Sequence, residues 1–303
     1  AYAVSEDLKK AGLPPDTQAS IVSVGDLPLG NRTVREAVEA ISAGSEKPQT
    51  HAAKVLEELK EYTQQGKRRV LESFQDWSVS SEIFLGTPAW VLIDAANKLK
   101  ADLIFVGSQG RSALGRLFLG SVSKRVATDA NCSVRVSRSN VQKTSNDSNT
   151  PPRIIVGVDG SPAAEQAIFS VGQRVWQDGT EVRLVTVDET VQPRRIASRL
   201  PQAAAMINSY FQTRAKRVSE MLEWGKEELN NIGLETSILR GKGGPKSVLI
   251  DEAKKWNADS IFVGTRDFKS AFERFELGSV STYVLTNAPC SVEVVRPPDA
   301  TQQ

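Results

Sequence analysis

The stretch Val106–Ser123 reads VGSQGRSALGRLFLGSVS, and its residues indicate the end of a strand, a loop and the start of a helix. The apolar run 103–106 leads into it and favours a buried strand. Gly107 and Gly110 then mark a loop, and the segment 121–130 has helical character. A strand, a glycine-lined loop and a helix N-terminus together make an anion site, because glycine allows close approach and free N–H groups favour negative charge. We therefore expect phosphate binding here rather than covalent catalysis.

Gly107, Gly110, Gly120 and Ser121 are spaced as G-x2-G-x9-G-S. This spacing resembles the signature of the ATP-binding branch of the universal stress protein family. Three glycines and a serine at fixed positions after an apolar strand are more specific than an isolated glycine pair. The resemblance implies that ATP is the ligand, with AMP or ADP as alternatives. Whether Mg²⁺ also binds, through the phosphates, is left open. The other reading, in which these glycines only form turns, also stays open.

Length and composition indicate a two-domain globular protein. The 303 residues suit two domains of about 150 residues each. The net charge of +2 gives no preference for nucleic acid, and no apolar run approaches the roughly 18 to 20 residues of a membrane span. Cys132 and Cys290 form no disulfide framework and fit a reducing compartment, so we expect a cytoplasmic location. With His51 as the single histidine, we expect no His-rich metal site, and no catalytic base stands out.

The second half of the chain repeats the first. Residues 88–107 recur as residues 245–264, at an offset of 245 − 88 = 157, and the four residues from Gly120 recur from Gly278 at an offset of 158. A repeat of this length indicates two globular copies rather than a solenoid. We expect copy one at residues 1–138, a linker rich in Ser, Asn, Thr and Pro at 139–152, and copy two at 153–303.

Copy two shows the full alternation of strands and helices. The run 153–158 reads as a buried strand, and Ser161-Pro162 has the residue types of a helix start. Alternation of this kind indicates a parallel sheet covered by helices on both faces. We expect an α/β fold with a five-stranded flavodoxin-like or Rossmann-like sheet in each copy, of strand order 3-2-1-4-5. Ligands then bind at the carboxyl ends of the first and fourth strands.

Copy one begins inside its own first helix. Val24 corresponds to Val187, an offset of 187 − 24 = 163, so the partner of Asp159 would lie upstream of Ala1. The first strand of copy one is thus missing from this sequence. Because a sheet centre cannot stay unpaired, we expect about a dozen further residues before Ala1 in the natural protein. A strand from a partner chain or a swapped segment is the alternative.

The glycine loop of copy two is degenerate. Asp267 stands where copy one has its second glycine, one residue is inserted, and Glu273 and Glu276 join the loop. A carboxylate beside a phosphate is repulsive by ~1 kcal/mol or more, which Arg266 and Lys269 offset only in part. We expect copy one to hold the better triphosphate site and copy two a weak or structural one.

The resemblance implies which residues contact the nucleotide. Val24 would lie beside the adenosine, residues 107–110 would wrap the ribose and phosphates, and residues 120–123 would cap the phosphate tail. Asp159 would face the adenine or ribose, although a helix-capping role alone is the alternative. The expected residues of copy one are Val24, Val106, Gly107, Ser108, Gln109, Gly110, Arg111, Gly120, Ser121, Val122 and Ser123. Those of the weaker copy-two site are Val158, Asp159, Val187, Gly264, Gly278, Ser279, Val280 and Ser281.

One further segment, Gly241–Ser247 (GKGGPKS), superficially resembles a P-loop. Pro245 breaks the required spacing and removes a donor N–H, so we expect a structural turn. Whether Lys242 or Lys246 lies at the edge of the ligand cleft is left open.

The last strands, 133–136 and 291–295, resemble those through which family members pair. We therefore expect an internal pseudo-dimer and leave a further homodimer open. The resemblance implies a stress-response or signalling role, through ligand-dependent conformation and a signalling partner that the sequence does not identify, with at most slow ATP hydrolysis. A non-nucleotide scaffold and a true phosphotransferase or hydrolase are the alternatives.

Overall fold

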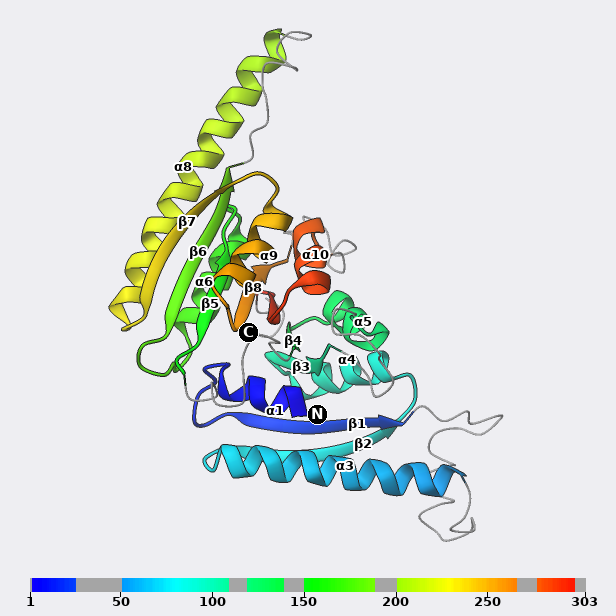
Figure 1. Ribbon diagram of the computed structural model, residues 1–303. Coiled ribbons are helices and arrows are strands. Elements are labelled where there is room, and N and C mark those ends of the chain that lie inside the picture. The colour runs from blue at the N-terminus through cyan, green and yellow to red at the C-terminus, as the bar shows by residue number, and fades with distance from the viewer. Residues whose placement is uncertain are drawn as a thin grey trace.

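The computed structural model describes residues 2–25, 51–108, 119–138, 150–188, 201–265 and 277–297, in which strands and helices alternate (Figure 1). Copy one contains α1 (Tyr2–Lys9), β1 (Gln18–Gly25), α3 (His51–Ser73), β2 (Ser78–Leu85), α4 (Pro88–Leu99), β3 (Leu103–Gly107), α5 (Ser121–Asp129) and β4 (Ser133–Ser137). Copy two contains β5 (Arg153–Gly157), α6 (Pro162–Gly172), β6 (Glu181–Asp188), α8 (Pro201–Asn231), β7 (Glu235–Lys242), α9 (Pro245–Lys255), β8 (Ser260–Gly264), α10 (Ser279–Asn287) and β9 (Ser291–Val295).

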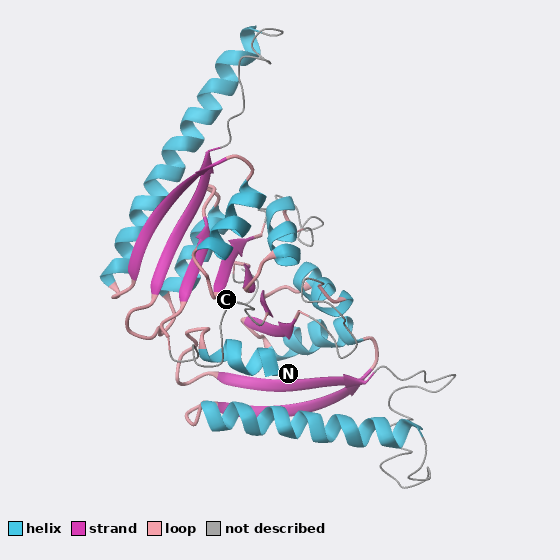
Figure 2. Cartoon of the chain, in the orientation of Figure 1, coloured by secondary structure: helices cyan, strands magenta, loops and turns pink. Residues whose placement is uncertain are grey.

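Copy two has the sheet that its sequence predicts. Its strands lie in the order β7-β6-β5-β8-β9, all parallel, which is 3-2-1-4-5 in chain order. Helices α6 and α8 pack against each other on one face of this sheet, and α9 and α10 pack together on the other (Figure 2). The first helix starts where the sequence predicts, because the Ser161 side chain accepts a hydrogen bond from the Ala164 N–H and Pro162 follows it.

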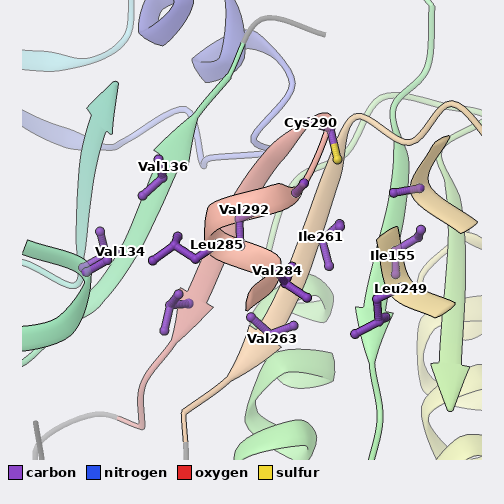
Figure 3. Close-up of a cluster of buried hydrophobic side chains, with 14 of the residues drawn as sticks. Val134, Val136, Ile155, Leu249, Ile261, Val263, Val284, Leu285, Cys290 and Val292 are labelled. Atoms are coloured by element: carbon purple, nitrogen blue, oxygen red, sulfur yellow. The ribbon is translucent and has the colours of Figure 1, made fainter. Parts of the chain in front are cut away.

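Two strands of copy one join the sheet of copy two. The last strand of copy one, β4, pairs antiparallel with the last strand of copy two, β9, so that a seven-stranded sheet runs through both. A single hydrophobic cluster lies over this junction, and Figure 3 shows Val134 and Val136 of copy one in it beside Val292 and Leu285 of copy two. This is the intramolecular pseudo-dimer that the sequence predicts.

Copy one differs from copy two at its centre. Strands β1 and β2 form a separate parallel two-stranded sheet, and β3 joins β4 in the large sheet. Among the described residues no strand lies between β1 and β3, which is the position that β5 fills in copy two. The helices still hold both parts in place, since α4 packs on β1 and β2 while α1 packs on β3, β4 and α3.

A chain of buried charges crosses the junction. Arg135 donates to the Asp7 carboxylate at 2.7 and 2.8 Å and to Glu293 at 3.3 Å, and Glu293 also accepts from Arg174. Arg135 and Glu293 face each other in the β4–β9 register, and both are fully buried. Burial opposes the charge of Arg135, but the two carboxylates outweigh it and raise the pKa of its guanidinium.

Candidate functional site

The two ends of the copy-one glycine motif meet at one helix N-terminus. Gly107 is the last residue of β3, and Gly120 is the N-cap of α5. The Gly120 N–H donates to the Ser108 carbonyl at 2.7 Å, which closes the loop between them. Residues Gln109, Gly110 and Arg111 lie outside the described residues.

The N-terminus of α5 keeps donors for an anion. Its Gly120 cap makes no side-chain capping bond, and the first N–H groups of any helix lack an intrahelical acceptor. Ser121 is exposed and Val122 is half-buried. The Ser123 hydroxyl instead donates to the Gly107 carbonyl at 2.5 Å, so Ser123 braces the helix against the strand end.

Val24 and Val106 lie on the two strands that flank the break in copy one. Val24 is half-buried near the end of β1 and pairs with Phe84 of β2. Val106 belongs to β3 and packs at the edge of the large hydrophobic cluster. The structure thus places both at the expected carboxyl-end edge, but in different sheets.

Copy two brings its expected residues together around the start of α6. Val158 follows β5, is 3% exposed and donates its N–H to the Val185 carbonyl, while Val187 is half-buried in β6. Gly264, at the end of β8, lies so close to α6 that an added Cβ would come within 2.6 Å of the Ala163 Cβ. The first and fourth strands therefore end side by side, as the predicted topology requires.

Asp159 has a local role at this point. It is exposed, and its Oδ1 accepts the Ser161 N–H at 3.0 Å in the turn before α6. This contact is the one that the helix-capping alternative predicts, and it leaves the nucleotide-facing role as a proposal.

The second glycine-serine element mirrors the first. Gly278 is the N-cap of α10, Ser279 is exposed, Val280 is half-buried, and the Ser281 hydroxyl donates to the Gly264 carbonyl at 2.8 Å. The loop that holds Asp267 lies outside the described residues.

The P-loop-like segment forms the junction of β7 and α9, with Gly244 as N-cap and Pro245 in the first helical turn. Lys246 lies over the Tyr283 ring of α10, 5.8 Å from its centroid. This is the structural turn that the sequence predicts.

The described residues contain no group of His, Cys, Asp and Glu side chains arranged to hold a metal ion. None of their helices has the length and apolar character needed to cross a membrane. A cavity of about 250 Å³, lined in part by Arg174, Trp176 and Leu234, lies at the opposite, amino-terminal edge of the copy-two sheet.

Two arginines at the junction were not singled out from the sequence. Arg138 and Arg296 follow β4 and β9, and each reaches carbonyl oxygens at the end of a helix in the other copy. Their offset of 296 − 138 = 158 is that of the repeat, so the duplication itself was the available signal.

Both copies are similar in sequence to proteins of one family. The model of the universal stress protein family matches twice, over residues 33–138 and 151–296. A universal stress protein of Mycolicibacterium smegmatis is 30% identical over 220 residues, which cover 73% of this chain and 69% of that protein. A putative universal stress protein of Staphylococcus aureus is 33% identical over 150 residues, covering 48% of this chain and 85% of that protein.

A solved structure agrees with the fold. A universal stress protein from Archaeoglobus fulgidus matches with a TM-score of 0.61 at 20% identity, covering 97% of this chain and 92% of that one. A family protein from Arabidopsis thaliana, solved with AMP bound, covers 50% of this chain and 96% of its own, with a TM-score of 0.34 at 20% identity. Two successive matches to the family model, in a chain with two flavodoxin-like copies, show that this protein belongs to the universal stress protein family.

Proposed function

We propose that this protein binds an adenine nucleotide, ATP foremost, at the carboxyl edge of copy one and acts in a stress response through the bound conformation. One observation carries the proposal: the Gly120 N–H bond to the Ser108 carbonyl brings both ends of the glycine motif to the N-terminus of α5. Backbone N–H groups at a helix N-terminus are suited to a phosphate.

The charges of the loops support copy one over copy two. Between Gly107 and Ser123 the sequence contains two arginines and no acidic residue. Between Gly264 and Ser281 it contains three acidic and three basic residues. A triphosphate is therefore favoured electrostatically in copy one, and Mg²⁺ would reach the site through the phosphates.

The proposal includes no catalytic step. The described ends of the copy-one motif supply backbone N–H groups and the Ser121 hydroxyl but no general base, so hydrolysis would be slow at most. Two free cysteines, Cys132 and Cys290, fit a reducing compartment and hence a cytoplasmic setting. The domain division at 139–152 and a signalling partner belong to the same proposal.

Calorimetric titration of the full chain with ATP and AMP tests the proposal. We expect one dominant site, and Gly110→Asp should weaken ATP binding at least tenfold, since it adds the carboxylate that copy two already carries. Asp267→Gly is the matched control, because it removes the acid from copy two and should leave the dominant site unchanged. Equal ATP affinity in wild type and Gly110→Asp would contradict the proposal.

A scaffold without nucleotide is the second candidate, and the turn contact of Asp159 favours it for copy two. If the whole chain is such a scaffold, neither ATP nor AMP gives heat with the wild type, with Gly110→Asp or with Asp267→Gly.

A further inference from the structure

Arg138 and Arg296 make a reciprocal pair of contacts between the copies. Arg296, which follows β9, donates to the carbonyls of Ala127 and Thr128 at 2.6 and 3.1 Å. Arg138, which follows β4, donates to the carbonyls of Leu285 and Thr286 at the same two distances. Each arginine thus binds the C-terminal end of a helix in the other copy, where carbonyl oxygens are unpaired and the helix dipole is negative.

The contacts extend beyond the helix ends. A further carbonyl accepts from each guanidinium, that of Cys132 for Arg296 at 3.1 Å and that of Ala288 for Arg138 at 3.0 Å. The backbone N–H of each arginine donates to a serine hydroxyl of the partner strand, Ser133 or Ser291. Burial lowers the pKa of both guanidiniums, that of Arg296 to about 10, so these carbonyls hold side chains that are largely removed from water.

The helices that these arginines hold are the ones that begin at the expected phosphate sites. Helix α5 has nine residues and runs from Ser121 to Asp129. A helix this short is marginal alone, so its position depends on the contacts at its two ends. Ser123 fixes the first turn to the Gly107 carbonyl, and Arg296 fixes the last turn from copy two. Helix α10 repeats the arrangement with Ser281 and Arg138.

The arginines are also joined to the glycine loops of their own copies. The Ser108 N–H donates to the Ser137 carbonyl at 3.0 Å, and Arg138 is the next residue. The Thr265 N–H donates to the Val295 carbonyl at 3.2 Å, and Arg296 is the next residue. Each loop is therefore hydrogen-bonded to the residue just before the arginine that holds α5 or α10 of the other copy.

We propose that Arg296 is a positioning residue for the nucleotide site of copy one and Arg138 for that of copy two, so that each copy sets the other's phosphate-binding helix. This rests on the proposed nucleotide function. It predicts an effect in trans: a substitution in copy two weakens binding in copy one, although Arg296 lies at the far end of α5 from the phosphates.

The pseudo-symmetry supplies the test and its control. In the full chain, Arg296→Met should weaken ATP binding at the copy-one site by about fivefold to tenfold, which is the size of a lost helix-end charge contact. Arg138→Met removes an equivalent set of contacts and should leave ATP affinity at that site within about twofold. Arg296→Lys, which restores the charge, should recover part of the loss.

Amide hydrogen exchange without ligand separates the two proposals. Arg296→Met should speed exchange in α5 and not in α10, and Arg138→Met should do the reverse. Equal losses of ATP affinity in both methionine variants, or no loss in either, would overturn the positioning role. A wild-type chain that binds no ATP would overturn the proposed function and the nucleotide part of this inference, while the crossed exchange pattern would still decide whether the arginines position the helices.

Discussion

The two copies share a sequence pattern but differ in the middle of their sheets. In copy two, β5 lies between β6 and β8, and four of the five residues of β8 are buried. In copy one the equivalent β3 is half-buried throughout, and β1 has one buried residue among eight. Helix packing and the β4–β9 junction therefore hold copy one together where its sheet is divided.

The first helices show the same contrast. Helix α6 buries five apolar residues, among them Ile168 and Val171. In α1 the described buried side chains are Leu8 and Asp7, and Asp7 is held by Arg135 and by the Ser137 hydroxyl at 2.8 Å. Charge pairing in copy one thus occupies the place that apolar packing takes in copy two.

The largest effect should come from breaking that charge pairing. Arg135→Met leaves Asp7 without its guanidinium partner and removes one of the two partners of Glu293 in a buried junction, so we expect a loss of about 3–5 kcal/mol of unfolding free energy. Urea denaturation measures it. Lys98→Met is the matched control, because Lys98 and Asp94 form an exposed pair worth at most about 1 kcal/mol. A similar small effect for both variants would show that the buried pairing is unimportant.

Backbone protection should differ between equivalent strands. Because β1 and β3 have no described strand between them, we expect their amides to exchange roughly tenfold faster or more than those of β6 and β8. Hydrogen exchange read by mass spectrometry on this 303-residue chain measures it. Equal protection in the two copies would mean that the position between β1 and β3 is filled.

The sequence predicted the repeated part of this architecture well. Alternation of strand and helix patterns, together with the constant offset, predicted the strand order of copy two and the helix start at Ser161. It also predicted that Gly107 ends a strand and that Gly120 precedes a helix, whereas their joint role in a nucleotide site stays a prediction.

Side-chain contacts between residues far apart in the chain could not be predicted from the sequence. An offset shows which residues are equivalent, but it does not show that Arg135 faces Glu293 across an antiparallel pair. The reach of Arg138 and Arg296 to helix ends in the other copy depends on how the copies dock. The hydroxyls of Ser123 and Ser281 were expected near phosphate, and the structure shows them bonded to strand-end carbonyls.

A smaller effect should sharpen the difference in how the strand ends pack. Gly264→Ala would push a methyl group against α6, so we expect a loss of about 1–3 kcal/mol in the stability of copy two. Gly157→Ala is the control, because its added Cβ meets neighbours at 3.4 Å or more and should cost only about 0.5 kcal/mol. Thermal unfolding of both variants checks the difference, and equal melting temperatures would refute the close approach of β8 to α6.

The smallest difference concerns the equivalent cysteines. Burial raises the pKa of the Cys290 thiol to about 12, so at pH 8 it stays protonated and inaccessible. Burial also raises the pKa of Cys132, but that residue is partly exposed. A thiol reagent should therefore modify Cys132 slowly in the native protein and Cys290 only after unfolding. Native labelling of Cys290 at the same rate would contradict the buried junction.

If copy one holds adenine nucleotide more tightly than copy two, photoaffinity labelling with 8-azido-ATP should locate the bound nucleotide in copy one. Peptides of the full chain would be mapped after irradiation, with excess ATP as the competitor. We predict competed labelling confined to copy-one peptides around β1 and residues 107–123. Competed labelling found only in copy two, or equally in both copies, would contradict a dominant nucleotide site in copy one.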